Sequence, residues 1–281
     1  MPGPVVYLNG ELVQYDDAKI GVEDRAVQFG DGVYEVVRYY GGRAFKMDSH
    51  MRRLVRSAAG VELPIPPVEE LVAAMDELVR RQGMTEATVY LQITRGQTTR
   101  FQGIPTGLRP NVIAIARPAT SERPATGLAA VTQSDDRWAR CHLKTTMLLP
   151  AMLARQRARR AGAEDAIFIR DGFVTEATAA NVFAALDGQP VTPPLSNYLL
   201  PGVTREALLE LYGRERIAYR EEPVSAERLA AAEEIFLTST NGELRPIVQL
   251  DGRPVGGGKV GPVFERTLAL FDAATRQLAP V

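Results

Sequence analysis

The sequence has one cysteine, two histidines and no long uninterrupted apolar run. A single cysteine excludes an intramolecular disulfide and fits a reducing compartment. One cysteine and two histidines are too few side chains for a dedicated zinc site. No apolar run reaches the roughly 20 residues that a membrane helix needs, and the first residues lack the basic start and apolar core of a secretory signal. These absences predict a cytoplasmic protein with no metal centre and no membrane anchor.

The chain also lacks an excess of either charge, with 33 Lys+Arg against 34 Asp+Glu. This balance gives no indication of binding to nucleic acid or to an anionic membrane. What is present is apolar material, since 45% of the 281 residues are hydrophobic. A chain of this length and composition can bury a large core in one large or two modest domains.

Local patterns predict a mixture of strands and helices. Asn9-Gly10 and Gly41-Gly42 each lie between two strand-like segments, as expected of β-hairpins. Apolar residues at helical spacing predict two helices in the first half, and further helices and strands alternate in the second half. We expect strands at 5–8, 12–15, 33–39, 43–47, 88–94, 112–116, 166–170, 181–185 and 235–238, and helices at 49–59, 67–82, 149–161, 204–212 and 260–278.

The segment 118–124 is rich in proline and polar residues and shows no periodicity. It is the predicted linker between a small N-terminal α+β domain, residues 1–117, and a larger C-terminal α+β domain, residues 125–281. Interspersed helices and antiparallel signals favour an α+β fold over a doubly wound parallel sheet. The second domain is expected to carry Lys144.

Lys144 has apolar neighbours on both sides, which is unusual for a surface lysine. A lysine in a partly desolvated site has a lowered pKa and can form a Schiff base with a carbonyl group. The simpler alternative is a lysine at a strand end with its head group in water. The residue alone does not decide between these two possibilities.

Three later segments could bind parts of a ligand. Glu176 precedes a run of small residues, so its carboxylate could hold a protonated ring nitrogen, or it could be a solvated turn residue. Gly202 and Thr204 open a helix whose N–H groups suit a phosphate, unless Thr204 is an ordinary N-cap. Three hydroxyl groups at 238–240 could add phosphate donors or form a polar turn.

The order of these features resembles that of class IV aminotransferases, which use pyridoxal 5′-phosphate. Pro190 departs from the family signature, which usually has a large aliphatic residue at that structural position. The residues that match the signature are Glu176, Thr178, Asn181, Phe183, Thr192, Leu200, Gly202, Val203 and Arg205.

Within that family the chain is most similar to the D-amino-acid aminotransferase branch, on the segments 24–25, 28–37, 50–54, 94–96 and 137–141. The resemblance implies a two-domain class IV fold in which Lys144 forms a Schiff base with the cofactor. Glu176 would pair with the pyridine nitrogen, and Leu200 would lie against the ring. The implied phosphate site comprises Arg53, Val203, Thr204 and Thr240, with Ser239 nearby.

The resemblance also implies a site for the substrate α-carboxylate, shared between the subunits of a homodimer. Tyr34 matches the family's tyrosine, and Arg100 matches an arginine supplied by the partner subunit. Gln102 stands where the family has a histidine. Because glutamine donates a hydrogen bond but brings no positive charge, this departure affects carboxylate binding. The alternative for Arg100 is a solvated loop residue.

The implied reaction is ping-pong transfer of an amino group from D-amino acids, such as D-alanine, to 2-oxo acids, such as 2-oxoglutarate. Three activities of the same fold remain as alternatives: (R)-amine transamination, L-branched-chain amino transfer, and 4-amino-4-deoxychorismate lysis. A non-catalytic phosphate-binding protein is a more distant alternative.

Overall fold

The computed structural model describes residues 4–119 and 126–278, which form two compact units. Of these residues, unit 1 comprises 4–119, Leu143–Met147 and 275–278, and unit 2 comprises 126–142 and 148–274. Each unit contains one sheet together with helices, which confirms the expected α+β class. None of the helices in the described ranges is long and apolar enough to span a bilayer.

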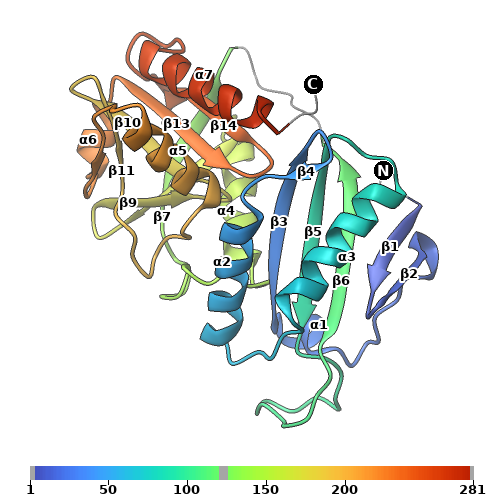
Figure 1. The fold of residues 1–281 in the computed structure, drawn as a ribbon. Helices are drawn as coiled ribbons and strands as arrows, with labels where there is room; N and C mark the ends of the chain where they lie inside the picture. Colours follow the sequence, from blue (N-terminus) through green and yellow to red (C-terminus); the bar gives the residue numbers. More distant parts are fainter. Residues whose placement is uncertain (1–3, 120–125, 279–281) are drawn as a thin grey trace. The chain divides into compact units, whose positions relative to one another are not determined.

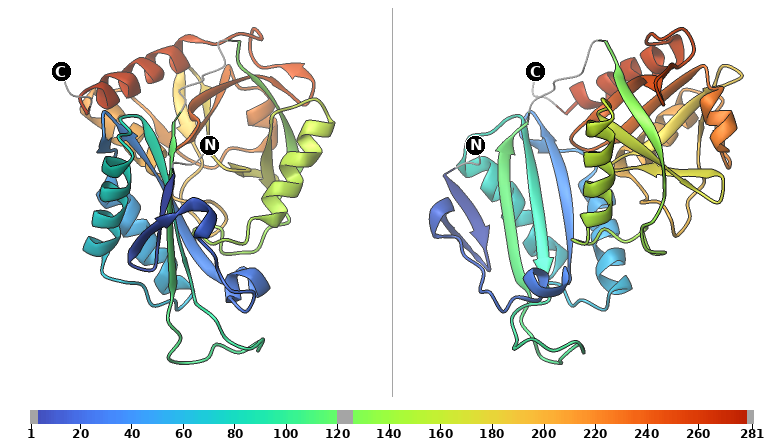
Figure 2. Two further views of the ribbon diagram at one scale, coloured as in Figure 1. Left: turned by 90° about the vertical axis from the view of Figure 1, so that its right-hand side faces the viewer. Right: turned by 180° about the vertical axis from the view of Figure 1, so that it is seen from behind.

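Unit 1 is built on an antiparallel sheet in the order β2-β1-β6-β5-β3-β4. Helices α2 and α3 lie on one face of this sheet, as the front and rear views both show (Figures 1 and 2). The strands are β1 Val5–Leu8, β2 Glu11–Gln14, β3 Gly32–Tyr40, β4 Arg43–Ala44, β5 Ala87–Thr94 and β6 Asn111–Pro118. The helices are the short 3-10 turn η1 Tyr15–Asp17, α1 Arg25–Phe29, α2 Met47–Gly60 and α3 Val68–Arg81.

Alternation along the strands divides the residues of unit 1 between its two faces. Val33 and Val37 of β3 are fully buried and belong to the same apolar core as Leu54 of α2. Tyr34 lies between them and therefore projects from the opposite face. There its ring approaches that of Tyr90 on β5, with 5.5 Å between centroids. The fold thus places Tyr34 on the face of the sheet that α2 and α3 leave uncovered.

Unit 2 contains a larger sheet in the order β12-β11-β10-β13-β14-β7-β8-β9, with β15 paired to β14. The pairs β11·β12, β14·β7 and β7·β8 are parallel, and the others are antiparallel. The strands are β7 Leu128–Ser134, β8 Asp165–Arg170, β9 Phe173–Ala177, β10 Asn181–Leu186, β11 Gln189–Thr192, β12 Arg220–Glu221, β13 Glu234–Ser239, β14 Glu243–Leu250 and β15 Arg253–Pro254. The helices are α4 Leu149–Arg160, α5 Val203–Arg214, α6 Ala226–Ala230 and α7 Pro262–Arg276.

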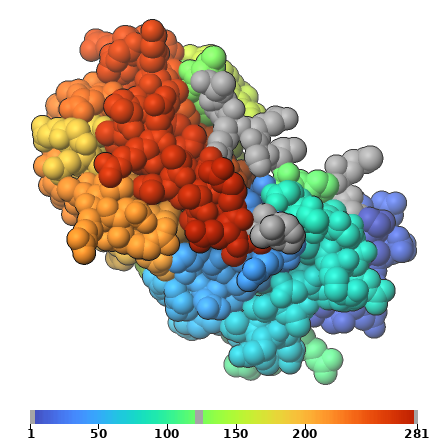
Figure 3. All heavy atoms as spheres, turned by 45° about the horizontal axis from the view of Figure 1, so that its top comes forward, coloured from blue at the N-terminus to red at the C-terminus, as the bar shows by residue number. Residues whose placement is uncertain are grey.

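Stacked aromatic rings join the helices of unit 2 to its sheet. Phe183 of β10 and Phe236 of β13 stack with their centroids 5.1 Å apart. Tyr212 of α5 meets Phe183 edge-on, and Phe264 of α7 meets Phe236 in the same manner. The outer side of α7 is seen in red on the surface of this unit (Figure 3). These contacts hold α5 against the centre of the sheet.

The division into units differs from the predicted domain organisation at one segment. Lys144 was expected in the C-terminal domain, but Leu143–Met147 groups with unit 1. The physical reason is direct pairing, because Thr145 forms an isolated β-bridge with Val33. Residues 120–124 of the predicted linker lie outside the described residues, and the boundaries 1–117 and 125–281 otherwise remain predictions.

Candidate active site

Lys144 is fixed through its backbone to unit 1. Its carbonyl oxygen accepts a hydrogen bond from Tyr34 N at 3.1 Å, and its own N–H donates to Ser57 Oγ at 3.0 Å. The side chain is half-buried, and Nζ lies 4.2 Å from the centroid of the Tyr34 ring. Within the described ranges, Nζ forms no salt bridge with a carboxylate. The backbone of Lys144 is therefore fixed, while no carboxylate of the described residues binds its amine.

Unit 1 also contains a buried polar group in which Arg53, a predicted phosphate ligand, pairs with Glu35, a residue to which the sequence analysis gave no role. Arg53 donates from Nε and Nη2 to the two oxygens of Glu35, both at 2.7 Å, and His50 Nδ1 lies 2.8 Å from Glu35 Oε2. Burial alone would raise the pKa of Glu35, but the charge and hydrogen bonds of Arg53 lower it to about 2. Burial lowers the pKa of His50, so the ring is neutral and donates from Nδ1.

The predicted carboxylate residues occupy two places in unit 1. Tyr34 lies in β3 with its ring against Lys144 Nζ. Arg100 and Gln102 are both exposed on the loop between β5 and β6, which extends beyond the end of the sheet (Figures 1 and 2). The exposure of Arg100 agrees with the alternative of a solvated loop residue in one isolated chain, and also with a residue that serves a second subunit.

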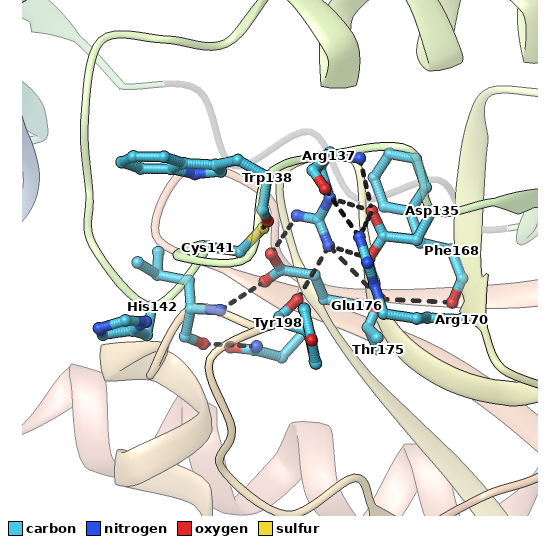
Figure 4. A network of polar contacts seen from close by, with 12 residues as sticks. Asp135, Arg137, Trp138, Cys141, His142, Phe168, Arg170, Thr175, Glu176 and Tyr198 are labelled. Carbon is cyan, nitrogen blue, oxygen red and sulfur yellow. Dashed lines mark hydrogen bonds and ion pairs between the residues drawn. The ribbon is translucent and has the colours of Figure 1, made fainter.

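Glu176 lies near the end of β9 in unit 2 and is only 6% exposed, so it is not a solvated turn residue. One carboxylate oxygen accepts a hydrogen bond from Arg137 Nη1 (Figure 4), and the other accepts from Leu200 N at 2.9 Å. Burial raises the pKa of Glu176, and this effect outweighs the opposing charge of Arg137. Each oxygen can accept a further hydrogen bond, and an additional donor would stabilise the ionised form.

The negative charge of Glu176 is only partly compensated, because Arg137 also binds Asp135. Arg137 Nε and Nη2 donate to both oxygens of the buried Asp135 at 2.9 Å, and its guanidinium lies 4.3 Å over the ring of Phe168. Burial alone would raise the pKa of Asp135, but Arg137 lowers it. Arg137 belongs to the 137–141 segment of the family resemblance, yet nothing in its local pattern indicated contact with Glu176. The residues are 39 positions apart in sequence.

The N-terminal end of α5 has no side-chain cap, a feature that suits a phosphate site. Thr204 is not the N-cap, because the helix begins at Val203 and its N-cap is Gly202, which offers no side-chain hydrogen bond. A Cβ atom on Gly202 would lie 1.9 Å from Asn181 Oδ1. Asn181 in turn donates from Nδ2 to the carbonyl oxygen of Leu200 at 2.8 Å. Asn181, Leu200 and Gly202, which match the signature, therefore form one packed group that leaves the helix N–H groups without a side-chain cap.

The hydroxyl residues after β13 have mixed environments. Ser239 Oγ accepts a hydrogen bond from Gly242 N at 3.1 Å, which is the turn role considered as an alternative. Thr240 follows it and is half-buried. Thr238 Oγ1 is buried and has no hydrogen-bond partner among the described residues. The segment thus combines one structural hydroxyl with a donor that is still unused.

Unit 1 thus contains a half-buried lysine, and unit 2 contains a buried glutamate and a helix that begins without a side-chain cap. A family model described as amino-transferase class IV matches residues 32–250. A D-alanine aminotransferase from Bacillus licheniformis is 38% identical over 92% of this chain and 92% of its own length. The chain therefore belongs to the class IV aminotransferase family, and it is an aminotransferase.

Solved structures give the same result for the fold. The branched-chain amino acid aminotransferase from Escherichia coli is 30% identical, has a TM-score of 0.92, and aligns over 99% of this chain and 96% of its own. A second branched-chain amino acid aminotransferase, from T.th. and solved with pyridoxamine 5′-phosphate, is 25% identical, also has a TM-score of 0.92, and covers 100% of this chain and 96% of its own. The predicted class IV fold is thus confirmed.

Proposed function

We propose that this aminotransferase transfers the amino group of D-amino acids, such as D-alanine, to 2-oxo acids, such as 2-oxoglutarate, with pyridoxal 5′-phosphate as cofactor. The support for the substrate class is the D-alanine aminotransferase relative at 38% identity, which exceeds the 30% of the branched-chain structure. The support for the cofactor is the family and the pyridoxamine 5′-phosphate of the T.th. enzyme. The class IV fold itself is common to the alternative activities.

The residues present fit the cofactor. The observation that carries the proposal is Glu176, a buried carboxylate whose raised pKa reflects incomplete compensation. A protonated pyridine nitrogen would supply the missing donor and positive charge. The N-terminus of α5, with Val203 and Thr204 in its first turn, would hold the phosphate, together with Thr240 and Arg53. Ser239 would lie near the phosphate, and Leu200 would lie against the ring.

When bound, pyridoxal phosphate supplies the electron sink that stabilises negative charge at the substrate Cα. Lys144 Nζ would bind the cofactor covalently and would serve as the base and acid that moves the proton of the substrate Cα. The Glu176 carboxylate would pair with the pyridine nitrogen and favour its protonated form. Tyr34, Arg100 and Gln102 orient the substrate through its α-carboxylate, and two such half-reactions complete the transfer.

A donor screen tests the substrate class. Purified holoenzyme is given 2-oxoglutarate with D-alanine, D-glutamate, L-leucine or (R)-1-phenylethylamine, and the oxo product of each donor is followed. We expect D-alanine to react with the highest kcat/KM. Reaction with L-leucine alone would identify a branched-chain enzyme, and reaction with the amine alone would identify an (R)-amine transaminase. Pyruvate released from aminodeoxychorismate without an amino acceptor would identify a lyase.

We further propose a homodimer in which Arg100 and Gln102 serve the partner subunit. Their exposure on a projecting loop supports this arrangement. Unit 1 also has a largely apolar hollow of about 350 Å³, lined by residues including Leu8, Ile113 and Ile115. We propose that a second copy of the chain covers this hollow in the dimer. Light scattering should give twice the chain mass of 30.7 kDa, and a monomeric mass would contradict the shared site.

The free, buried Cys141 supports a cytoplasmic location.

A further inference from the structure

The loop between β5 and β6 presents a problem of positioning. Arg100 and Gln102 are exposed, so burial of their own side chains does not fix them. A flexible loop would carry an ordering cost each time that it bound a carboxylate, and small misplacements of binding groups reduce rates strongly. A site that uses these residues therefore needs a rigid support beneath the loop.

Arg25 of α1 contacts the loop at its functional centre. Its side chain is 4% exposed, and Nη1 donates to the carbonyl oxygen of Phe101 at 2.8 Å. Phe101 is the residue between Arg100 and Gln102. Through Nε, Arg25 also donates to Asp31 Oδ2 at 2.8 Å. One buried guanidinium thus connects this backbone carbonyl to the carboxylate of Asp31, the residue before β3.

The anchor continues into the body of unit 1. Asp31 Oδ2 also accepts from Arg95 Nε at 2.8 Å, and Arg95 donates to the carbonyl oxygens of Val61 and Glu62 at the end of α2. Burial alone would raise the pKa of Asp31, but Arg95 and Arg25 lower it, so Asp31 is ionised at neutral pH. The loop is therefore linked by charge-assisted hydrogen bonds to α2.

Phe29 of the same short helix holds the side chain of Arg100. The guanidinium carbon of Arg100 lies 5.1 Å from the Phe29 ring centroid, and that of Arg25 lies 4.8 Å from it. Both distances are within the range of cation–π attraction. Helix α1 is itself fixed, because the Asp24 side chain accepts from Ala26 N at 2.7 Å. It therefore supports the backbone and the guanidinium of Arg100 together.

We propose that Arg25 and Phe29 are positioning residues that set the geometry of the substrate α-carboxylate site. Arg25 acts through the Phe101 carbonyl, and Phe29 acts through the Arg100 guanidinium. This inference rests on the proposed role of Arg100 in binding that carboxylate. It assigns the preference for amino acids over plain amines in part to two residues that do not touch the substrate.

Four variants of the holoenzyme test the proposal: Arg25→Lys, Phe29→Leu, Arg100→Ala and, as matched control, Val27→Ala, whose side chain on the same helix is 67% exposed. Lysine can still pair with Asp31, but it lacks the fork that reaches Phe101 as well. The primary measurement is the calorimetric Kd of propionate, a carboxylate that lacks the amino group. Kinetics with D-alanine, cofactor affinity and thermal unfolding are measured alongside.

We expect the propionate Kd to rise about tenfold in Arg25→Lys, as loss of a charge-assisted hydrogen bond predicts, and about threefold in Phe29→Leu. Val27→Ala should match the wild type. The KM for D-alanine should rise in parallel while kcat and cofactor affinity change little, a split that general loss of structure does not produce. Phe29→Leu keeps every hydrogen bond of Arg25, so it remains informative if Arg25→Lys folds poorly.

The outcomes separate this inference from the function on which it rests. If Arg100→Ala weakens propionate binding but Arg25→Lys and Phe29→Leu stay within about twofold of the wild type, the positioning role is wrong and the role of Arg100 stands. If Arg100→Ala binds propionate as the wild type does, the carboxylate role of Arg100 fails and the positioning role fails with it. An equal loss of cofactor affinity and kcat would show that α1 is only structural.

Discussion

Two buried glutamates, one in each unit, are paired with arginine, but their charges are compensated to different degrees. Glu35 receives both prongs of Arg53 and the His50 ring, and its pKa falls to about 2. Glu176 receives one hydrogen bond from an arginine that Asp135 also engages, and its pKa is raised. A fully compensated carboxylate stabilises the fold, whereas an under-compensated one is ready for a further donor. The contrast is consistent with our proposal that Glu176, and not Glu35, binds the cofactor.

The largest expected effect is the loss of turnover on replacement of Lys144, whose chemistry Glu176 would support. Lys144→Ala removes the nucleophile and the base, so turnover should fall by about three orders of magnitude or more. Steady-state transamination of D-alanine measures the loss. Lys259→Ala, which changes an exposed lysine, is the matched control and should keep full activity. Comparable activity in the two variants would remove Lys144 from the mechanism.

Glu35→Gln should act on stability. The change leaves the buried Arg53 guanidinium without the carboxylate that accepts two of its N–H groups, at a cost of about 3–5 kcal/mol in the free energy of unfolding. Urea unfolding measures this loss. Glu86→Gln, which alters a half-exposed partner of Arg38, should cost much less. Equal losses of unfolding free energy in the two variants would show that the pair of Glu35 with Arg53 does not stabilise the fold.

The same variant has a defined pH dependence. The folded-state pKa of Glu35 is lowered from 4.5 to about 2, so its ionised form stabilises the folded state above the unfolded-state value. The difference in unfolding free energy between wild type and Glu35→Gln should be full above about pH 4.5 and should shrink as the pH falls toward 2. A difference that grew on acidification would contradict the assignment.

Glu176→Gln should act on catalysis, with turnover lowered about 100-fold, because an amide cannot keep the pyridine nitrogen protonated. Stability should change little, since Arg137 keeps Asp135 and a buried charge with a raised pKa has been removed. Stopped-flow kinetics and thermal unfolding are measured together, with the exposed Glu265→Gln as control. A large loss of stability with normal turnover would reverse the roles of Glu35 and Glu176.

The smallest expected effect concerns the helix end in unit 2. Gly202→Ala places a methyl group against Asn181, so cofactor affinity should fall about tenfold and stability by about 1–3 kcal/mol. Gly213→Ala in the same helix has nothing within 4 Å of its Cβ and should be neutral or slightly stabilising. Cofactor titration followed by absorbance distinguishes them. Equal affinities would mean that the end of α5 does not hold the phosphate.

Local sequence signals predicted much of the fold. The Asn9-Gly10 hairpin and the helices α4 and α5 lie close to their expected ranges, because turn residues and apolar periodicity are local properties. The short strands β7, β9, β11 and β12 and the short helices α1 and α6 were not predicted. Several of these strands pair with segments that are distant in sequence, and a segment of two to seven residues carries little periodicity.

Sequence predicted only those residues of the candidate site that belong to the family's sequence motifs. Lys144, Glu176 and Gly202 match that pattern, but the pairing of Glu176 with Arg137 joins residues 39 apart. The helix face of α2 shows the limit of apolar patterns: Val55, which apolar spacing would bury, is 44% exposed, while His50 and Arg53 are buried. Both side chains are buried because Glu35, on another element, accepts their hydrogen bonds, and one-dimensional patterns do not record such partners.

The central claim, that Lys144 carries the cofactor, has one direct test. The sequence contains four lysines, Lys19, Lys46, Lys144 and Lys259, so a single adduct is easily located. The purified holoenzyme is reduced with borohydride, digested and mapped by mass spectrometry. We expect a yellow protein whose reduced phosphopyridoxyl group lies on the peptide that contains Lys144. An adduct on another lysine, or no adduct at all, would contradict the account.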